Sequence, residues 1–202
     1  TPLFLASMNG HVDTACLLLD EGAPVEKGRA GGWSPLGIAC ACGNVDVATL
    51  LVERGADSAA VNTCIGGAPP LLFACRSRNL GAMRLCLEHG ADPDWANGAI
   101  LYDAFTNGRF DAALLLLESG AKEVDRATKR GMTPLYMACL IGHVDAARLL
   151  LDKGAEVDKA EEDGWTPLFI ACFNGHVDAV RLLLENGAEV DCARKDGATP
   201  LG

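Results

Sequence analysis

A constant distance between two sequence anchors recurs along the 202-residue chain and restricts its fold more than any other feature. The first anchor is the Pro of a Thr-Pro-Leu-like motif, and the second is the Gly of a Gly-Ala pair. The second follows the first by 20 residues in six copies, whereas 10 to 15 residues separate each Gly from the next Pro position. Constant segments beside variable ones indicate packed structure joined by tolerant loops. The anchor pairs are Pro2 and Gly22, Pro35 and Gly55, Pro70 and Gly90, Ile100 and Gly120, Pro134 and Gly154, and Pro167 and Gly187.

The constant segment predicts two short helices, most clearly in the sixth copy. Thr166 suits the N-cap of the first helix, Pro167 suits its first position, and Gly175 ends it. A polar and an apolar face are also expected on the second helix, which Gly187 closes. The expected buried residues are Leu168, Ala171 and Cys172 in the first helix and Val177, Val180, Leu183 and Leu184 in the second, with Asp178, Arg181 and Glu185 on the polar face.

Helices this short are unstable alone in water, so each must be buried against neighbouring copies. The architecture is therefore a solenoid, in which each repeat contacts only the next. We expect one domain over residues 1–202. Its repeats lie near residues 1–33, 34–68, 69–98, 99–132, 133–165 and 166–198, with a partial seventh at 199–202. Because the first copy starts inside the motif, we expect the chain to be a fragment of a longer array.

The pattern T-P-L-x-x-A, G-H-x-D, L-L-L and G-A, repeated at about 33 residues, closely resembles the ankyrin repeat. The resemblance extends over essentially the whole chain. It implies an all-α ankyrin-repeat solenoid of antiparallel helix pairs, with hairpin-like fingers projecting to one side. It also implies binding of a partner protein on the concave face that fingers and first helices form.

Composition narrows the class of partner and the compartment. The net charge of −10 argues against nucleic acid, because phosphates would be repelled. No apolar run reaches the roughly 18 residues of a membrane helix, so direct membrane insertion is not expected. Nine Cys is an odd number, and most of them fall at apolar repeat positions. This favours free thiols in a reducing compartment, the cytoplasm or the nucleus.

Two recurring columns of reactive side chains are better explained by the scaffold than by catalysis. His11, His143 and His176 share one repeat position, which suits a turn and helix-start hydrogen bond. A column of Cys is too widely spaced for metal ligation and suits core packing. We therefore expect no catalytic residue, metal or cofactor. The Cys column is Cys40, Cys75, Cys139 and Cys172.

The fourth copy departs most from the pattern. Its preceding finger is three residues short, Ile100 replaces Pro, and Asp103 lies within a helix. One interpretation is a drifted repeat with a local bend. The other is a specialised pocket or kink near Trp95, Tyr102 and Asp103.

Neighbouring fingers carry opposite charge. The finger at 122–131 is basic and the one at 156–163 is acidic. They could pair with each other, although exposed pairs contribute only about 0–1 kcal/mol. They could equally orient a charged partner.

Candidate partner-binding residues are those that vary where the scaffold makes no demand. Five of them, Met132, Leu140, Ile141, Trp165 and Phe173, are expected to form an apolar patch across copies five and six. Large apolar side chains without a scaffold role are typical interface anchors. The alternative is that Trp165 and Phe173 pack on the adjacent finger or helix. The full candidate set is Trp33, Arg76, Trp95, Tyr102, Met132, Leu140, Ile141, Trp165, Phe173 and Asn174.

The leading functional hypothesis is a non-catalytic scaffold that binds a partner protein and is a monomer in isolation. One alternative is a regulatory segment of a larger enzyme or channel polypeptide. Another is a purely structural spacer, which predicts no specific partner.

Overall fold

The computed structural model describes residues 1–28, 32–64 and 66–190, so the predicted start of a seventh repeat at 199–202 lies outside the described residues. The chain forms two compact units, Thr1–Pro93 and Asp94–Gly202. The described part of the first unit contains α1 (Pro2–Asn9), α2 (Val12–Asp20), α3 (Pro35–Cys42), α4 (Val45–Glu53), the 3-10 helix η1 (Ser58–Asn62), α5 (Pro70–Arg76) and α6 (Leu80–Glu88). That of the second contains α7 (Trp95–Thr106), α8 (Phe110–Glu118), α9 (Pro134–Ile141), α10 (Val144–Asp152), α11 (Pro167–Phe173) and α12 (Val177–Glu185).

The first helix of most copies begins as predicted. The Thr166 hydroxyl accepts a hydrogen bond from the backbone N–H of Phe169, 3.1 Å away, and Pro167 occupies the first helical position. This cap satisfies one of the N–H groups that a helix start leaves without a partner. The same cap is made by Thr1, Ser34 and Thr133.

The predicted buried face of α12 is only partly correct. Leu183 is buried as predicted, but the other buried side chains of α12 are Ala179 and Leu182, which were not among the predicted ones. Val177 and Leu184 are exposed, the latter by 44%. Helix α12 packs on α10 and α11, and no helix follows it in the part of the chain that the structure describes. The side that Val177 and Leu184 present therefore remains uncovered.

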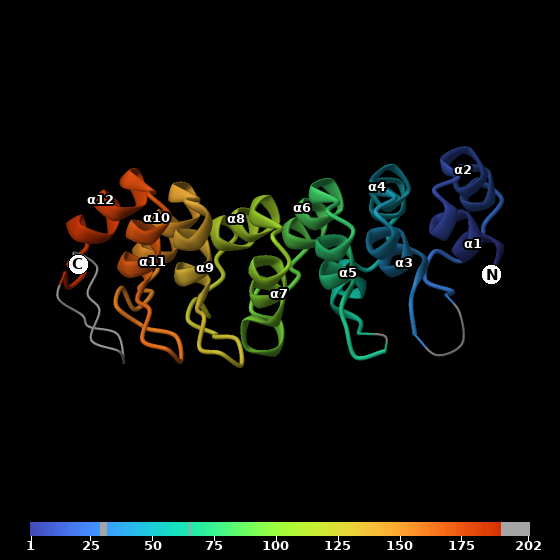
Figure 1. Ribbon diagram of the computed structural model, residues 1–202. Coiled ribbons are helices and arrows are strands. Elements are labelled where there is room, and N and C mark those ends of the chain that lie inside the picture. The colour runs from blue at the N-terminus through green and yellow to red at the C-terminus, as the bar shows by residue number, and fades with distance from the viewer. Residues whose placement is uncertain (29–31, 65, 191–202) are drawn as a thin grey trace. The chain divides into compact units, whose positions relative to one another are not determined.

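Packing within each unit follows the stacking order expected of a solenoid. In the first unit α1 contacts α3, and α3 contacts α5. In the second unit α7 contacts α9 and α9 contacts α11, while α8, α10 and α12 form a second layer (Figure 1). Small buried residues, such as Ala39 and Ala138, let these short helices approach closely. Within each unit, a repeat thus completes its core with the next one.

The Cys column belongs to this core, as predicted, with one partial exception. Cys40, Cys75 and Cys139 are buried, while Cys172 is half-buried. Burial raises the pKa of the Cys139 thiol to about 12, because the thiolate would lose its hydration. A thiol in that state is chemically inert at neutral pH.

Thiol labelling should separate the buried and exposed cysteines. At neutral pH and without denaturant, a maleimide is expected to modify the exposed Cys64 and leave Cys139 unmodified. Peptide mass spectrometry after brief labelling measures both sites. Full modification of Cys139 in denaturant is the control. Equal labelling of the two sites in the folded protein would contradict the assignment of Cys139 to the core.

The fingers are tied to one another by hydrogen bonds that the sequence reading did not anticipate. In each case a side-chain oxygen of one finger accepts a hydrogen bond from a backbone N–H of the next finger. Since both partners recur once per repeat, these bonds extend the stacking from the helices to the fingers. The pairs are Glu26 with the Asp57 N–H, Asn62 with Asp92, Asp94 with Lys122 and Glu123, Asp125 with Glu156, and Asp158 with Glu189.

The irregular fourth copy contains a bend next to Trp95, which is compatible with both interpretations of this copy. Ala96, Asn97 and Gly98 at the start of α7 have φ values of 52°, 57° and 72°, so three successive residues are left-handed. The guanidinium of Arg126 donates hydrogen bonds to the carbonyls of Ala96 and Asn97 and holds this turn. A shortened finger therefore becomes a turn that the following finger stabilises.

Asp103, in the same copy, has a structural partner. Its carboxylate lies 2.9 Å from the guanidinium of Arg109, and both side chains are largely buried. Arg109 occupies the position that His holds in the regular copies. The pair explains how this copy tolerates a carboxylate within a helix.

Candidate protein-interaction surface

The structure places the ten candidate residues in several locations. Trp33 and Arg76 belong to the first unit, whereas the remaining candidates belong to the second. Trp33, Trp95, Tyr102, Met132 and Trp165 are half-buried, and Arg76, Leu140, Ile141, Phe173 and Asn174 are exposed.

Three exposed apolar side chains gather where α9 and α11 end. Phe173 is 71% exposed, the largest value among the large hydrophobic residues that the structure describes, and Leu140 and Ile141 are also exposed. The two helix ends are joined by Asn174, whose side-chain amide donates a 3.1 Å hydrogen bond to the Leu140 carbonyl. We call Leu140, Ile141 and Phe173 the apolar patch. Helix packing leaves these side chains without cover in the described structure.

Trp165 connects the apolar patch to the adjacent finger. Its ring lies 5.3 Å from that of Phe173 and 4.6 Å from that of Phe169, both in edge-on contacts. The alternative interpretation, that Trp165 packs on a helix, is thus correct for this residue. Edge-on aromatic pairs contribute about 0.5–1.5 kcal/mol beyond their buried area. Trp165 therefore holds the exposed Phe173 ring through an edge-on contact.

A hollow of about 240 Å³ opens between the fingers that precede α9 and α11. We call it the finger hollow. The two fingers are hairpin-like, as predicted, and the Glu162 N–H of one donates a 2.9 Å hydrogen bond to the Arg130 carbonyl of the other (Figure 1). Met132 and Trp165, predicted to lie together, both line it. The complete lining is Arg130, Met132, Tyr136, Glu161, Asp163, Trp165 and Ile170.

Glu161 is the member of the finger hollow that sequence reasoning missed. It looked like one of several solvated acids in its finger, yet its side chain is only 3% exposed. Its Oε1 atom accepts hydrogen bonds from the backbone N–H groups of Asp163, at 2.8 Å, and Trp165, at 3.2 Å. The finger turn itself folds over this carboxylate. Only the short spacing from Glu161 to Trp165 hinted at such a turn.

The opposite charges of the two fingers meet at one point. The guanidinium of Arg130 lies 3.3 Å from the Asp163 carboxylate and 4.0 Å from Glu161 Oε2. Other finger charges have local partners: Lys159 pairs with Glu156 at 2.7 Å, and Arg126 holds the left-handed turn. Mutual pairing, one of the two predicted uses of these charges, is therefore present at Arg130 and Asp163.

Trp33 occupies the repeat position of Trp165 but packs differently. Its ring makes an edge-on contact, 5.2 Å between centroids, with Phe73 of the next first helix, α5. Its own helix offers Gly37 and Ala41 where α11 offers Phe169 and Phe173. Without aromatic partners on its own helix, Trp33 packs across the repeat boundary.

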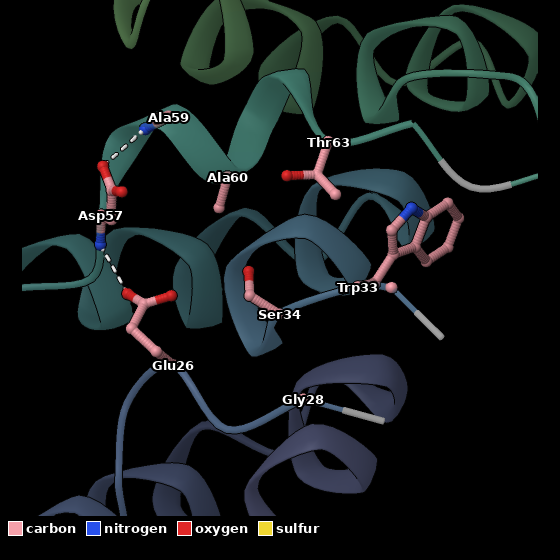
Figure 2. A pocket seen from close by; sticks show the side chains of 9 residues that line it. Glu26, Gly28, Trp33, Ser34, Asp57, Ala59, Ala60 and Thr63 are labelled. Carbon is pink, nitrogen blue, oxygen red and sulfur yellow. Dashed lines mark hydrogen bonds between the residues drawn. The ribbon is translucent and has the colours of Figure 1, made fainter. Parts of the chain in front are cut away.

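A second hollow, of about 500 Å³, lies beside Trp33. Figure 2 shows Trp33 and Thr63 on one side of it and Glu26 and Asp57 on the other. Both acids are engaged locally, because Glu26 accepts a bond from the Asp57 N–H and Asp57 accepts one from the Ala59 N–H. These contacts are part of the inter-finger and 3-10 helix scaffold.

Trp95 and Tyr102 flank the left-handed turn. The guanidinium of Arg126 stands over the Tyr102 ring, 5.4 Å from its centroid, while it bonds the turn carbonyls. The cation–π contact gives Tyr102 a role in holding the bend. A partner-binding role for these two residues stays a prediction.

The shared His position serves the scaffold in two of the three predicted cases. His143 Nδ1 accepts a 3.4 Å hydrogen bond from the Ala146 N–H, and His176 Nε2 lies 3.2 Å from the Leu140 carbonyl. His11 makes no side-chain cap. Among the described residues no cluster of potential metal ligands is found, and no described helix is long and apolar enough to span a bilayer.

Comparison with known proteins assigns the family. The family described as "Ankyrin repeats (3 copies)" matches residues 1–62 and 122–196, and "Ankyrin repeat" matches residues 66–95. Protein phosphatase 1 regulatory subunit 27 is 40% identical in its human form and 36% in its mouse form, over 58 residues, or 29% of this chain. The chain spans only 37% of the length of these relatives.

Solved ankyrin repeat structures match all or nearly all of the chain. The human ASB11 ankyrin repeat domain is 30% identical with a TM-score of 0.65, covering 100% of this chain and 90% of that one. The Bcl-3 ankyrin repeat domain is 27% identical with a TM-score of 0.67, covering 100% of this chain and 92% of that one. An ankyrin repeat domain from Acinetobacter baumannii AYE is 28% identical with a TM-score of 0.70, covering 93% of this chain and 98% of that one. With its twelve described α-helices, its capped first helices and these matches, the chain belongs to the ankyrin-repeat family.

Proposed function

We propose that the chain is a non-catalytic scaffold that binds a partner protein on the surface formed by fingers and first helices of the second unit. Ankyrin repeats generally mediate protein–protein interactions. The observation that carries the proposal is Phe173, which is 71% exposed while Trp165 supports its ring. A large aromatic ring held in place at the surface is ready to bury its area without further ordering.

The neighbours of Phe173 also suit an interface. Leu140 and Ile141 extend the apolar area, and the polar Asn174 adjoins it. The paired charges of Arg130 and Asp163 line the finger hollow, to which Trp165 connects Phe173. An apolar centre with a polar rim is the usual anatomy of a protein interface. Burial of such a centre contributes about 25 cal/mol per Å² of apolar area.

Truncation of Phe173 should weaken partner binding. Once a partner has been captured by crosslinking and purified, the Phe173→Ala variant is expected to bind it about tenfold more weakly or worse, as loss of an interface anchor does. Isothermal titration calorimetry measures the affinity. Val177→Ala is the matched control, because Val177 is also an exposed apolar residue on the same repeat but lies outside the apolar patch. Equal affinities for the two variants would show that the apolar patch is not the binding surface.

A second candidate function is regulation of an enzyme, either as a subunit or as a segment of a larger enzyme or channel polypeptide. The supporting observation is the similarity to proteins named as regulatory subunits of protein phosphatase 1. Titration of purified protein phosphatase 1 with the chain tests regulation in trans. A phosphatase rate that stays constant at all chain concentrations would eliminate this form of the function.

The proposal includes a reducing compartment, the cytoplasm or the nucleus, and a monomeric state in isolation. The buried free thiols support a reducing compartment, because cysteines that pack as small hydrophobic residues do not depend on disulfide bonds. Light scattering of the purified chain tests the monomeric state. A mass of twice 21.1 kDa would contradict it.

A further inference from the structure

The finger hollow carries more negative than positive charge. Two carboxylates, Glu161 and Asp163, line it together with a single cation, Arg130. The guanidinium lies 3.3 Å from Asp163 but 4.0 Å from Glu161 Oε2, which is beyond hydrogen-bond distance. Arg130 is also 65% exposed, so solvent screens its attraction for the buried acid. The second oxygen of Glu161 is therefore incompletely neutralised.

The position of Glu161 makes that oxygen a directed acceptor. The carboxylate is held by the N–H groups of Asp163 and Trp165, both on Oε1, and its side chain is 97% buried. A buried carboxylate is costly unless it is paired and hydrogen-bonded. A further cation that enters the finger hollow would gain a charge-assisted hydrogen bond without having to order its acceptor.

The remaining walls of the finger hollow favour a cationic side chain with an apolar stem. Trp165 and Tyr136 provide aromatic surface, and Met132 and Ile170 provide aliphatic surface. Cations bind near aromatic rings through the ring quadrupole, and the stems of Lys and Arg pack on apolar walls. Burial raises the pKa of the Tyr136 hydroxyl. The negative charge of Glu161 raises this pKa further, while the positive charge of Arg130 partly offsets the shift.

We propose that the finger hollow accepts a Lys or Arg side chain of a partner protein, which bonds to Glu161 while a neighbouring apolar residue of the same segment packs on Phe173. This inference rests on the proposed function and specifies its partner. Trp165 lies in both places, because it lines the finger hollow and contacts Phe173. A single extended segment can therefore reach both. The net charge of −10 also attracts basic partners before contact.

An acidic segment would meet unfavourable charges on the same surface. It would have to displace Asp163 from Arg130 and approach Glu161, a like charge. Like-charge contacts at an interface disfavour the wrong partner. The finger hollow therefore favours the cationic segment over the acidic one.

Peptide selection with the whole chain tests the inference. A displayed library of random dodecapeptides is selected on the immobilised chain, and selected peptides are synthesised for affinity measurement. The expected sequences contain Lys or Arg with a nearby apolar residue. Glu161→Gln keeps the side-chain shape and one acceptor oxygen but removes the negative charge. It is expected to weaken binding of these peptides about tenfold. Asp163→Asn is expected to weaken it about two- to fivefold, because Asp163 is exposed.

Glu162→Gln is the matched control, because Glu162 is an exposed acid of the same finger that does not line the finger hollow. Its variant should bind like the unmodified chain. Selected peptides without Lys or Arg, or equal affinities for the Glu161→Gln, Asp163→Asn and Glu162→Gln variants, would overturn the cation assignment. Acidic consensus sequences would assign the surface to the opposite partner class.

The two proposals fail in different ways. If Phe173→Ala weakens peptide binding but the acid substitutions do not, the apolar patch binds partners without a cation in the finger hollow. If Phe173→Ala and Val177→Ala bind equally, or no peptide binds the chain, both proposals are wrong. Unfolding midpoints of all variants confirm that folded proteins are compared, and Asp163→Asn remains decisive if Glu161→Gln unfolds.

Discussion

Replacing Leu183 with alanine is expected to lower the free energy of unfolding by about 2–5 kcal/mol, the range for truncating a buried leucine. Leu183 is fully buried in α12, which packs on α10 and α11. The substitution leaves a cavity where these three helices meet, and short helices have little stability apart from such packing. Chemical denaturation followed by circular dichroism measures the loss.

Two neighbours of Leu183 serve as controls. Leu184→Ala makes the same chemical change one residue away, where the side chain is 44% exposed, and Glu185→Ala changes an exposed residue of the same helix. Glu185→Ala is expected to cost less than about 0.5 kcal/mol, and Leu184→Ala less than Leu183→Ala. Similar denaturation midpoints for Leu183→Ala and Leu184→Ala would overturn the assignment of the buried face of α12.

Replacing Gly98 with alanine is expected to lower the free energy of unfolding by about 2–4 kcal/mol. Its φ of 72° lies in the left-handed region, where a Cβ is unfavourable. An ideal Cβ there would also lie 2.7 Å from Glu123 Cβ and 2.9 Å from the Glu123 carbonyl oxygen. The carbonyl belongs to the backbone, so the contact is relieved only by moving the finger that Arg126 and Asp94 tie to the turn.

Gly154→Ala separates the two causes. Gly154 also has a positive φ, 87°, but an added Cβ would meet nothing within 4 Å. Its substitution is expected to cost about 1–2 kcal/mol, from backbone conformation alone. Denaturation midpoints of the two variants, measured side by side, give the difference. If Gly154→Ala is as harmful as Gly98→Ala, the contact with Glu123 has no energetic importance.

Much of the fold follows from local sequence because its determinants act within one repeat. A Thr or Ser before Pro caps the first helix through an N–H three residues away, and the constant 20-residue segment then dictates two helices. The burial of Leu168, Ala171 and Leu183 was predictable for the same reason. The bend in the fourth copy was foreseeable from its shortened finger and from Ile100.

Burial at the edge of the stack was not predictable, because it depends on the neighbouring repeat. Val177 and Leu184 have the periodicity of core residues, yet no described helix covers them. The equivalent Val144 of α10 is half-buried, since α12 packs against α10. The same periodic position is thus half-buried in α10 and exposed in α12, where no described helix stacks on it.

The sequence by itself determined the repeat, the caps of its first helices, the membership of the Cys column in the core and the candidate residues of the fifth and sixth copies. Tertiary structure alone decided what those residues can do. Trp33 and Trp165 share one repeat position, but they contact different rings. Trp165 contacts two rings of the helix that follows it, α11, whereas Trp33 contacts Phe73 of the next repeat's first helix, α5. Glu161 resembles a solvated acid until the finger turn buries it. The physical reason is that caps and turns are short-range, whereas burial and charge balance depend on side chains about one repeat, or some 33 residues, away in sequence.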